Sequence, residues 1–294
     1  MVRRLTSPRL EFEAAAIYEY PEHLRSFLND LPTRPGVYLF HGESDTMPLY
    51  IGKSINIRSR VLSHLRTPDE AAMLRQSRRI SWICTAGEIG ALLLEARLIK
   101  EQQPLFNKRL RRNRQLCALQ LNEKRVDVVY AKEVDFSRAP NLFGLFANRR
   151  AALQALQTIA DEQKLCYGLL GLEPLSRGRA CFRSALKRCA GACCGKESHD
   201  HALRLRQSLE RLRVVCWPWK GAVALKEQHP EMTQYHIIQN WLWLGAVNSL
   251  KEATTLIRAP AGFDHDGYKI LCKPLLSGNY EITELDPVND QQAS

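Results

Sequence analysis

Phenol, guanidinium and carboxylate groups, which can take part in chemistry, occur in the first third of the chain; among them are Tyr38, Tyr50, Arg60 and Glu95. Glu95 lies in the segment 89–102, which is apolar almost all round. An uncompensated carboxylate in such surroundings is costly, and carboxylate oxygens are the ligands that hard divalent cations prefer. We therefore predict that Glu95 binds Mg²⁺ or Mn²⁺, with a solvated surface glutamate as the alternative.

The hydropathy pattern predicts the elements that must position these side chains. Segments 35–40 and 48–53 are apolar, β-rich runs with a polar segment containing Gly, Ser and Asp between them, which indicates a β-hairpin. Segment 57–65 has apolar residues at helical spacing with basic residues between them, and 89–102 is expected to form a second helix. Segment 80–85 alternates as a third strand.

The sequence is strongly basic, with a formal net charge of +11 over 294 residues. Such a charge favours a polyanionic partner: nucleic acid first, and an anionic membrane surface second. No run of about 18 apolar residues is present, and glutamates interrupt the N-terminal segment, so it lacks the apolar core of a signal peptide. We expect a cytoplasmic protein without a membrane partner, in which the nine cysteines are buried thiols or metal ligands rather than disulfides.

Five features occur together in one order along the chain: the tripeptides at 36–38 and 50–52, Arg60, Glu95 and Asn107. In order and spacing they resemble the GIY-YIG nuclease family, whose helix arginine, metal carboxylate and asparagine fall on these residues. Segment 92–100 is similar in order and residue type to the N-terminal half of the bacterial repair nuclease UvrC. The resemblance implies an α+β fold: a small three-stranded antiparallel sheet flanked by helices, then a mixed cysteine-rich region and a β-rich C-terminal part.

A GIY-YIG nuclease hydrolyses a phosphodiester, which requires an activated water, positive charge at the phosphate and help for the leaving 3′-oxygen. The resemblance implies that Arg60 binds the scissile phosphate through bidentate hydrogen bonds, with a solvated helix arginine as the alternative. It also implies that Tyr38 or Tyr50 deprotonates the water once Lys53 and the metal have lowered its pKa. The sequence leaves open which of the two tyrosines does so.

Four further residues are assigned to this site. His64 follows Arg60 by one helical turn, so the two are expected on one polar face. Some family members have histidine at this position, whereas UvrC typically has tyrosine; His64 is either a proton-shuttling or phosphate-contacting residue or a solvated histidine. Positioning roles are implied for Gly36, Gly52 and Asn107.

A basic run follows the second predicted helix: Lys108, Arg109, Arg111, Arg112 and Arg114. Here the sequence departs from UvrC, where acidic residues are expected after the matching arginines. Beside a nuclease motif, we predict that these side chains contact the DNA backbone, which adds salt dependence rather than sequence choice. A solvated charged face is the alternative.

Four cysteines further along form the pattern C-x14-C-x7-C-x3-C: Cys166, Cys181, Cys189 and Cys193. Four soft thiolates in one short stretch can bind an iron–sulfur cluster or a zinc ion, and the last two gaps are similar to the cysteine-rich segment of UvrC. We predict a metal centre, with a 4Fe–4S cluster favoured over zinc and Cys194 as the alternative to Cys193. The competing interpretation is that these thiols are small buried hydrophobic residues.

The expected organisation has five parts: a lead-in helix in 1–32, the GIY-YIG domain in 33–110, a UvrC-like connecting and cysteine-rich region in 111–216, a β-rich domain in 217–287 and a tail in 288–294. Within the β-rich domain, 235–244 and 268–274 are predicted as strands and 249–258 as a helix. Its tryptophans are expected to fill a core rather than to stack on bases. The helix predicted over 201–213 is not a convincing copy of the UvrB-binding hairpin of UvrC.

The resemblance implies a metal-dependent DNA endonuclease of nucleotide excision repair. Its substrate would be damaged double-stranded DNA, nicked on the 3′ side of the lesion after UvrA has loaded UvrB. No counterpart of the second nuclease of UvrC is recognised, so no 5′ incision is expected. Two alternatives remain: a standalone GIY-YIG nuclease independent of UvrB, and a non-catalytic iron–sulfur DNA-binding or sensor protein. The intact set of Tyr38, Tyr50, Arg60 and Glu95 argues against the second alternative.

Overall fold

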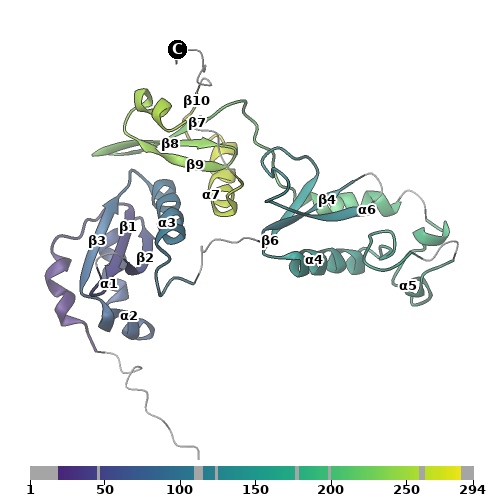
Figure 1. The fold of residues 1–294 in the computed structure, drawn as a ribbon, viewed down its shortest axis with the longest axis horizontal. Coiled ribbons are helices and arrows are strands. Elements are labelled where there is room, and N and C mark those ends of the chain that lie inside the picture. Colours follow the sequence, from purple (N-terminus) through teal and green to yellow (C-terminus); the bar gives the residue numbers. More distant parts are fainter. Residues whose placement is uncertain are drawn as a thin grey trace, which may run out of the picture. The chain divides into compact units, whose positions relative to one another are not determined.

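The structure is a computed structural model that describes seven stretches of the chain: residues 19–44, 47–108, 115–122, 125–175, 179–197, 200–257 and 262–285. Contacts divide the chain into two units, Met1–Arg111 with Glu227–Gln234, and Arg112–Lys226 with Tyr235–Ser294. The elements form an α+β fold with three small antiparallel sheets (Figure 1). The predicted tail at 288–294 lies outside the described residues.

The first unit is built on a three-stranded antiparallel sheet of β1 (Gly36–His41), β2 (Pro48–Ser54) and β3 (Arg79–Cys84), in the order β2-β1-β3. This confirms the predicted hairpin and third strand. Every residue of the central strand β1 is buried, because both faces of the sheet are covered. Across the hairpin, Tyr38 lies opposite Gly52.

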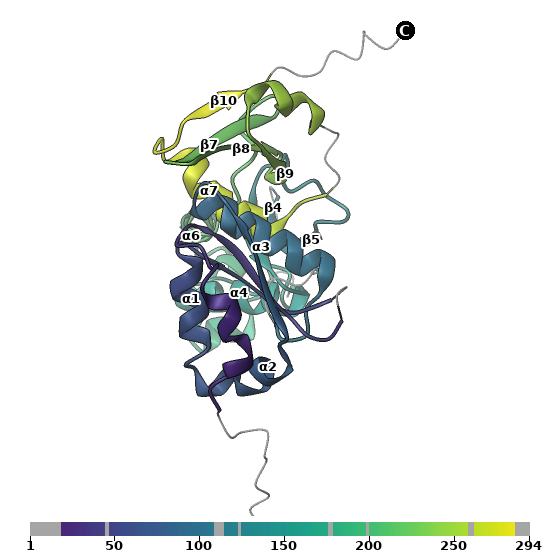
Figure 2. The ribbon, with the colours of Figure 1, turned by 90° about the vertical axis from the view of Figure 1, so that its left-hand side faces the viewer.

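Helices cover both faces of this sheet (Figure 2). They are η2 (Glu22–Leu28), α1 (Ile57–His64), η3 (Pro68–Glu70), α2 (Ala71–Gln76) and α3 (Glu88–Gln102). Alternate residues of β1 face opposite sides: Val37 and Leu39 pack with Ile99 of α3, whereas Tyr38 and Phe40 belong to the cluster that contains η2, α1 and α2. The lead-in helix predicted in 1–32 is the short 3₁₀-helix η2, not an α-helix.

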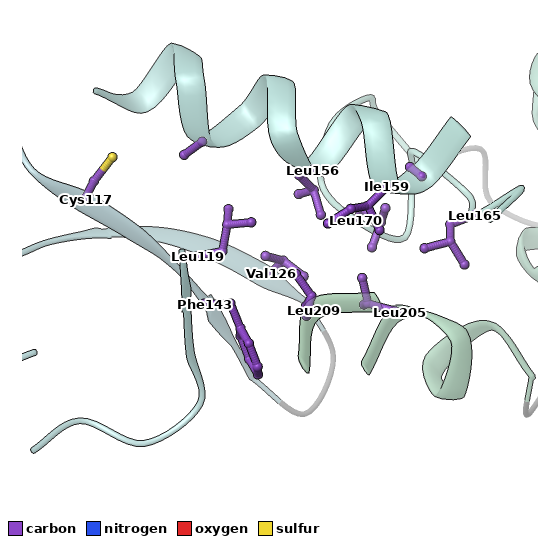
Figure 3. Packing of buried hydrophobic residues seen from close by; sticks show 12 residues of the cluster. Cys117, Leu119, Val126, Phe143, Leu156, Ile159, Leu165, Leu170, Leu205 and Leu209 are labelled. Atoms are coloured by element: carbon purple, nitrogen blue, oxygen red, sulfur yellow. The ribbon is translucent and has the colours of Figure 1, made fainter. Parts of the chain in front are cut away.

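The second unit contains a sheet of β4 (Cys117–Leu121), β5 (Val126–Tyr130) and β6 (Leu142–Phe146), in the order β5-β4-β6. Its apolar residues pack with α4 (Arg149–Glu162) and α6 (Asp200–Glu210) in one buried cluster (Figure 3). The side chain of Asn148 accepts a hydrogen bond from the Ala151 amide and so begins α4. The helix predicted over 201–213 is present as α6.

The C-terminal sheet has four strands in the order β10-β7-β8-β9. They are β7 (Val223–His229), β8 (Met232–Gln239), β9 (Leu242–Val247) and β10 (Ile282–Glu284). The single strand predicted over 235–244 is wrong, because Asn240 and Trp241 have positive φ angles and form a turn between β8 and β9. The helix predicted over 249–258 is the 3₁₀-helix η5 (Leu250–Thr255).

The strand predicted over 268–274 is also wrong, since these residues lie in α7 (His265–Leu276). Tyr268, Leu271 and Leu275 are its buried residues, and their spacing is helical. Tyr268 packs edge-to-face against the fully buried Trp241, with ring centroids 5.1 Å apart, and Trp241 packs against Trp217 in the same way. Trp217 and Trp241 therefore fill a core, as expected. Within the described residues, no helix is long and apolar enough to span a membrane.

Candidate active site and cysteine cluster

The two tyrosines are held close together by the β1–β2 hairpin. Their ring centroids are 6.3 Å apart, and Tyr38 is almost fully buried, with 1% of its surface exposed. Gly52 makes this possible, because a Cβ atom there would lie 2.3 Å from the Tyr38 hydroxyl oxygen. A Cβ atom at Gly36 would lie 2.2 Å from the carbonyl oxygen of Ile83 on β3. Gly52 is thus required by close packing against the tyrosines, and Gly36 by the close approach of β3.

Arg60 reaches the tyrosines from α1. This helix begins at Asn56, whose side chain accepts a hydrogen bond of 2.9 Å from the Ser59 amide. Burial by itself lowers the pKa of Arg60, but its hydrogen bond with Tyr38 and the nearby phenols raise it overall. The guanidinium is therefore charged and lies where the phenols converge.

Two hydrogen bonds link three side chains of this site in a chain. The Tyr38 hydroxyl lies 2.6 Å from Nε2 of His64, and Nδ1 of His64 hydrogen-bonds to Oε2 of Glu70. A carboxylate only accepts, so in a neutral imidazole Nδ1 carries the proton and Nε2 accepts from Tyr38. His64 and Arg60 lie on one face of α1, as expected, since both side chains contact the Tyr38 hydroxyl. The alternative of a solvated histidine is wrong, because His64 is 1% exposed.

Glu70 is a site residue that the sequence analysis missed. It ends the 3₁₀-turn η3 after His64, and 31% of its side chain is exposed. The available signal was an acidic residue in a Pro-Asp-Glu turn close behind a helix histidine. That signal is weak, because turns are rich in acidic residues that face solvent.

The pKa values of both tyrosines are raised. Burial and the neighbouring Tyr50 raise the pKa of Tyr38 far above its ordinary value, and burial together with the charge of Glu95 raises the pKa of Tyr50. The Lys53 ammonium, to which such a lowering was assigned, pairs with the Glu88 carboxylate at 2.6 Å. Neither phenol ionises without help from a neighbouring base or cation.

Glu95 comes from α3 and hydrogen-bonds to the edge of the hairpin. Its Oε1 accepts from the Lys53 amide at 3.0 Å. Burial raises the pKa of Glu95, while Lys53 and Arg60 oppose that effect. A hard cation at this carboxylate would offset the cost of burial, and Mg²⁺ is commonly bound through one or two carboxylates with water and phosphate as the other ligands. The residue therefore fits a divalent metal ion.

Asn107 ties the loop after α3 to the hairpin. Its Oδ1 accepts from the Ile51 amide at 2.9 Å, and its Nδ2 donates to the Ile51 carbonyl at 2.8 Å. The side chain thus pairs with both backbone groups of the central residue of the second tripeptide. Lys108 follows and is exposed. The rest of the basic run lies outside the described residues: Arg109, Arg111, Arg112 and Arg114.

The four cysteines that the sequence pattern singled out lie together in the second unit. The sulfur atoms of Cys166, Cys181, Cys189 and Cys193 are all within 4.8 Å of one another. Two short helices, α5 (Phe182–Ala185) and η4 (Ala192–Cys194), place the second and fourth of them. Cys194 has a different environment, with its Sγ 3.2 Å from the Gly191 carbonyl.

Burial changes the acidity of these thiols. It raises the pKa of Cys166 and raises that of Cys189 to about 12. Burial also acts to raise the pKa of Cys181, but hydrogen bonds from the Ser184 amide and the neighbouring thiols lower it overall. Such a donor set suits soft or borderline metals, which bind the thiolate form.

The fold and the matched family models together define a metal-dependent GIY-YIG endonuclease. A UvrC-like GIY-YIG domain matches residues 34–108, the UvrC/Cho excinuclease middle domain matches 109–211, and the excinuclease Cho C-terminal domain matches 222–289.

Excinuclease Cho of Escherichia coli (strain K12) is 97% identical over the whole of both chains. Excinuclease Cho of Salmonella typhi is 81% identical over 97% of this chain and 98% of the relative. The chain belongs to the excinuclease Cho family, nucleases of excision repair. A crystal structure of the GIY-YIG N-terminal endonuclease domain of UvrC from Thermotoga maritima, bound to its catalytic cation magnesium, is 30% identical over 31% of this chain and 99% of that chain, with a TM-score of 0.27.

Proposed function

We propose that this enzyme nicks damaged double-stranded DNA on the 3′ side of a lesion, together with UvrB that UvrA has loaded. The observation that carries the proposal is that Arg60 hydrogen-bonds to Tyr38 and interacts electrostatically with Glu95. The likeness to the half of UvrC that makes the 3′ incision supports the side of the cut, and no 5′ incision is proposed. Recognition of damage is assigned to UvrB, because no base-reading groove element is recognised in the sequence.

The side chains have separate roles in the proposed reaction. Arg60 binds the scissile phosphate and stabilises the negative charge that builds on it. Glu95 would hold Mg²⁺ or Mn²⁺, which would supply further positive charge to stabilise the phosphate. Asn107 positions the loop behind α3 through its two hydrogen bonds to Ile51. Lys108 and the arginines that follow it are proposed to contact the DNA backbone.

The proton of the attacking water is proposed to leave through the tyrosines. Tyr50 is half-buried and interacts with Glu95 and with the hydroxyl of Tyr38. As the water oxygen bonds to phosphorus, its proton passes to Tyr50, the Tyr50 proton to Tyr38, and the Tyr38 proton to Nε2 of His64. The P–O3′ bond breaks, and the leaving oxygen takes a proton from solvent. Glu70 stabilises the imidazolium that forms.

The four clustered cysteines are proposed to hold a structural metal centre. Sulfurs within 4.8 Å of one another approach the spacing of about 3.8 Å that four ligands 2.3 Å from a tetrahedral zinc ion would have. The resemblance to UvrC supports a 4Fe–4S cluster, for which the sulfurs would have to move apart. Either metal would cross-link the segments that carry the four cysteines and so stabilise the fold, as structural metal sites do. We also propose the five-part organisation and the cytoplasmic location that were expected from the sequence.

The incision assignment predicts a dependence on partners and on Glu95. On a duplex with one defined lesion and Mg²⁺, we expect a single nick 3′ to the lesion only when UvrA and UvrB are both present. Glu95→Ala should lower the rate by at least roughly 100-fold, whereas Glu101→Ala, an exposed glutamate of the same helix, should not. Nicking without UvrB would identify a standalone nuclease, and activity in Glu95→Ala would refute the metal assignment.

The proton route predicts that Glu70→Gln slows the chemical step. The amide keeps an oxygen that can accept from Nδ1 of His64 but loses the charge that stabilises an imidazolium. We expect kcat to fall about 10- to 100-fold with KM for DNA unchanged. Glu22→Gln, on an exposed pair with Arg25, is the matched control. Single-turnover nicking is the measurement, and a wild-type kcat in Glu70→Gln would contradict the route.

The cysteine assignment predicts bound metal in the purified protein. Anaerobic purification followed by absorption spectroscopy and metal analysis should give either a brown protein with iron and sulfide or a colourless one with one zinc per chain. Cys189→Ser should lose the metal, whereas Cys272→Ser, a cysteine outside the cluster, should keep it. Protein without stoichiometric iron or zinc would overturn the assignment.

A further inference from the structure

The segment Glu227–Gln234, around the turn between β7 and β8, belongs by its contacts to the unit that contains the nuclease sheet. Its polar contacts there are Glu231 with Arg34 (2.6 Å), Gln234 with the Ala86 amide (2.8 Å), and Glu227 with the amides of Ile89 and Gly90 (2.9 and 2.7 Å). The last of these contacts lies at the N-terminus of α3, the helix that carries Glu95.

Helix α3 has no cap of its own. The residue before its first turn is Gly87, and no local side chain accepts from the first amides. The Glu227 carboxylate takes this role from far along the chain, since one oxygen accepts from Ile89 and the other from Gly90. A negative charge at a helix N-terminus is favourable because it meets free N–H groups and the positive end of the helix dipole. Glu227 is 6% exposed, so water does not replace it there.

Gly87 leaves the space that the carboxylate fills. A Cβ atom at Gly87 would lie 2.2 Å from Oε1 of Glu227 and 2.5 Å from its carboxyl carbon. Any other residue at this position would force the carboxylate away from the helix. The sequence thus combines an uncapped helix start with a glutamate that fits against it.

The capped helix is fixed to the hairpin at two further points. Glu88 pairs with the Lys53 ammonium at 2.6 Å, and Glu95, about two turns along the helix, accepts from the Lys53 amide at 3.0 Å. A shift of the first turn would therefore move the carboxylate at the site. We propose that Glu227 is a positioning residue, which holds α3 so that Glu95 is presented for divalent cation binding. This inference rests on the metal role proposed for Glu95.

The test uses the full chain and three variants, Glu227→Ala, Glu227→Gln and Gly87→Ala. Gly42→Ala is the matched control, because a Cβ atom at Gly42 would approach no atom closer than 3.4 Å. Hydrogen exchange of residues 88–95 and calorimetric titration with Mn²⁺ in the absence of DNA are measured on each. We expect faster exchange and a Kd for Mn²⁺ raised about tenfold in Glu227→Ala and Gly87→Ala, and intermediate values in Glu227→Gln, which keeps one acceptor oxygen.

An unchanged Kd in Gly87→Ala and Glu227→Gln would overturn the inference, whether or not Glu227→Ala folds. Faster exchange with a wild-type Kd would overturn it too, because Glu227 would then be only a helix cap. Failure of the proposed function has a different signature: wild-type protein would bind no Mn²⁺, or Glu95→Ala would bind it as tightly as wild type. Binding that is lost in Glu95→Ala but unchanged in all three variants would reject the role of Glu227 alone.

Discussion

The hydrogen bond between the Tyr38 hydroxyl and Nε2 of His64 is the contact on which the nuclease site depends. Both side chains are 1% exposed, and a buried polar group left without a partner costs about 1–3 kcal/mol. The Tyr38 hydroxyl also accepts a hydrogen bond from Arg60. Because Glu70 accepts from Nδ1 on the far side of the imidazole, Tyr38 must donate to Nε2 of a neutral ring. This requirement fixes the tautomer of His64 and the direction in which the Tyr38 proton points.

The remaining parts of the site are arranged around this buried chain. The hairpin supplies the two phenols, α1 supplies the guanidinium of Arg60, and α3 supplies the carboxylate of Glu95. Backbone groups of the hairpin then hold the other elements in place, since Lys53 donates to Glu95 and Ile51 pairs with Asn107. Polar groups of the hairpin thus hold α3 and the loop after it in place. The same short segments therefore carry both the reactive side chains and the contacts that position them.

Local pattern was sufficient to predict the hairpin, the third strand and both main helices, whereas the grouping of Tyr38, Arg60 and Glu95 was implied by the family resemblance. It failed where a role depends on a tertiary partner. Helical spacing placed His64 with the basic residues, but its burial is decided by Tyr38 and Glu70. Strand-like alternation over 268–274 hid α7, in which the buried Tyr268 packs against Trp241. Glu227 carries no local signal at all, because the helix that it caps begins far away in the sequence.

The tautomer of His64 is the most direct test of this account. Long-range ¹⁵N–¹H correlation on the full chain with labelled histidine, assigned through a His64→Gln variant, reports which ring nitrogen carries the proton. The account predicts a proton on Nδ1, facing Glu70, and an unprotonated Nε2 that accepts from Tyr38. A neutral ring protonated on Nε2 would contradict it, because Nε2 could then no longer take the proton of Tyr38.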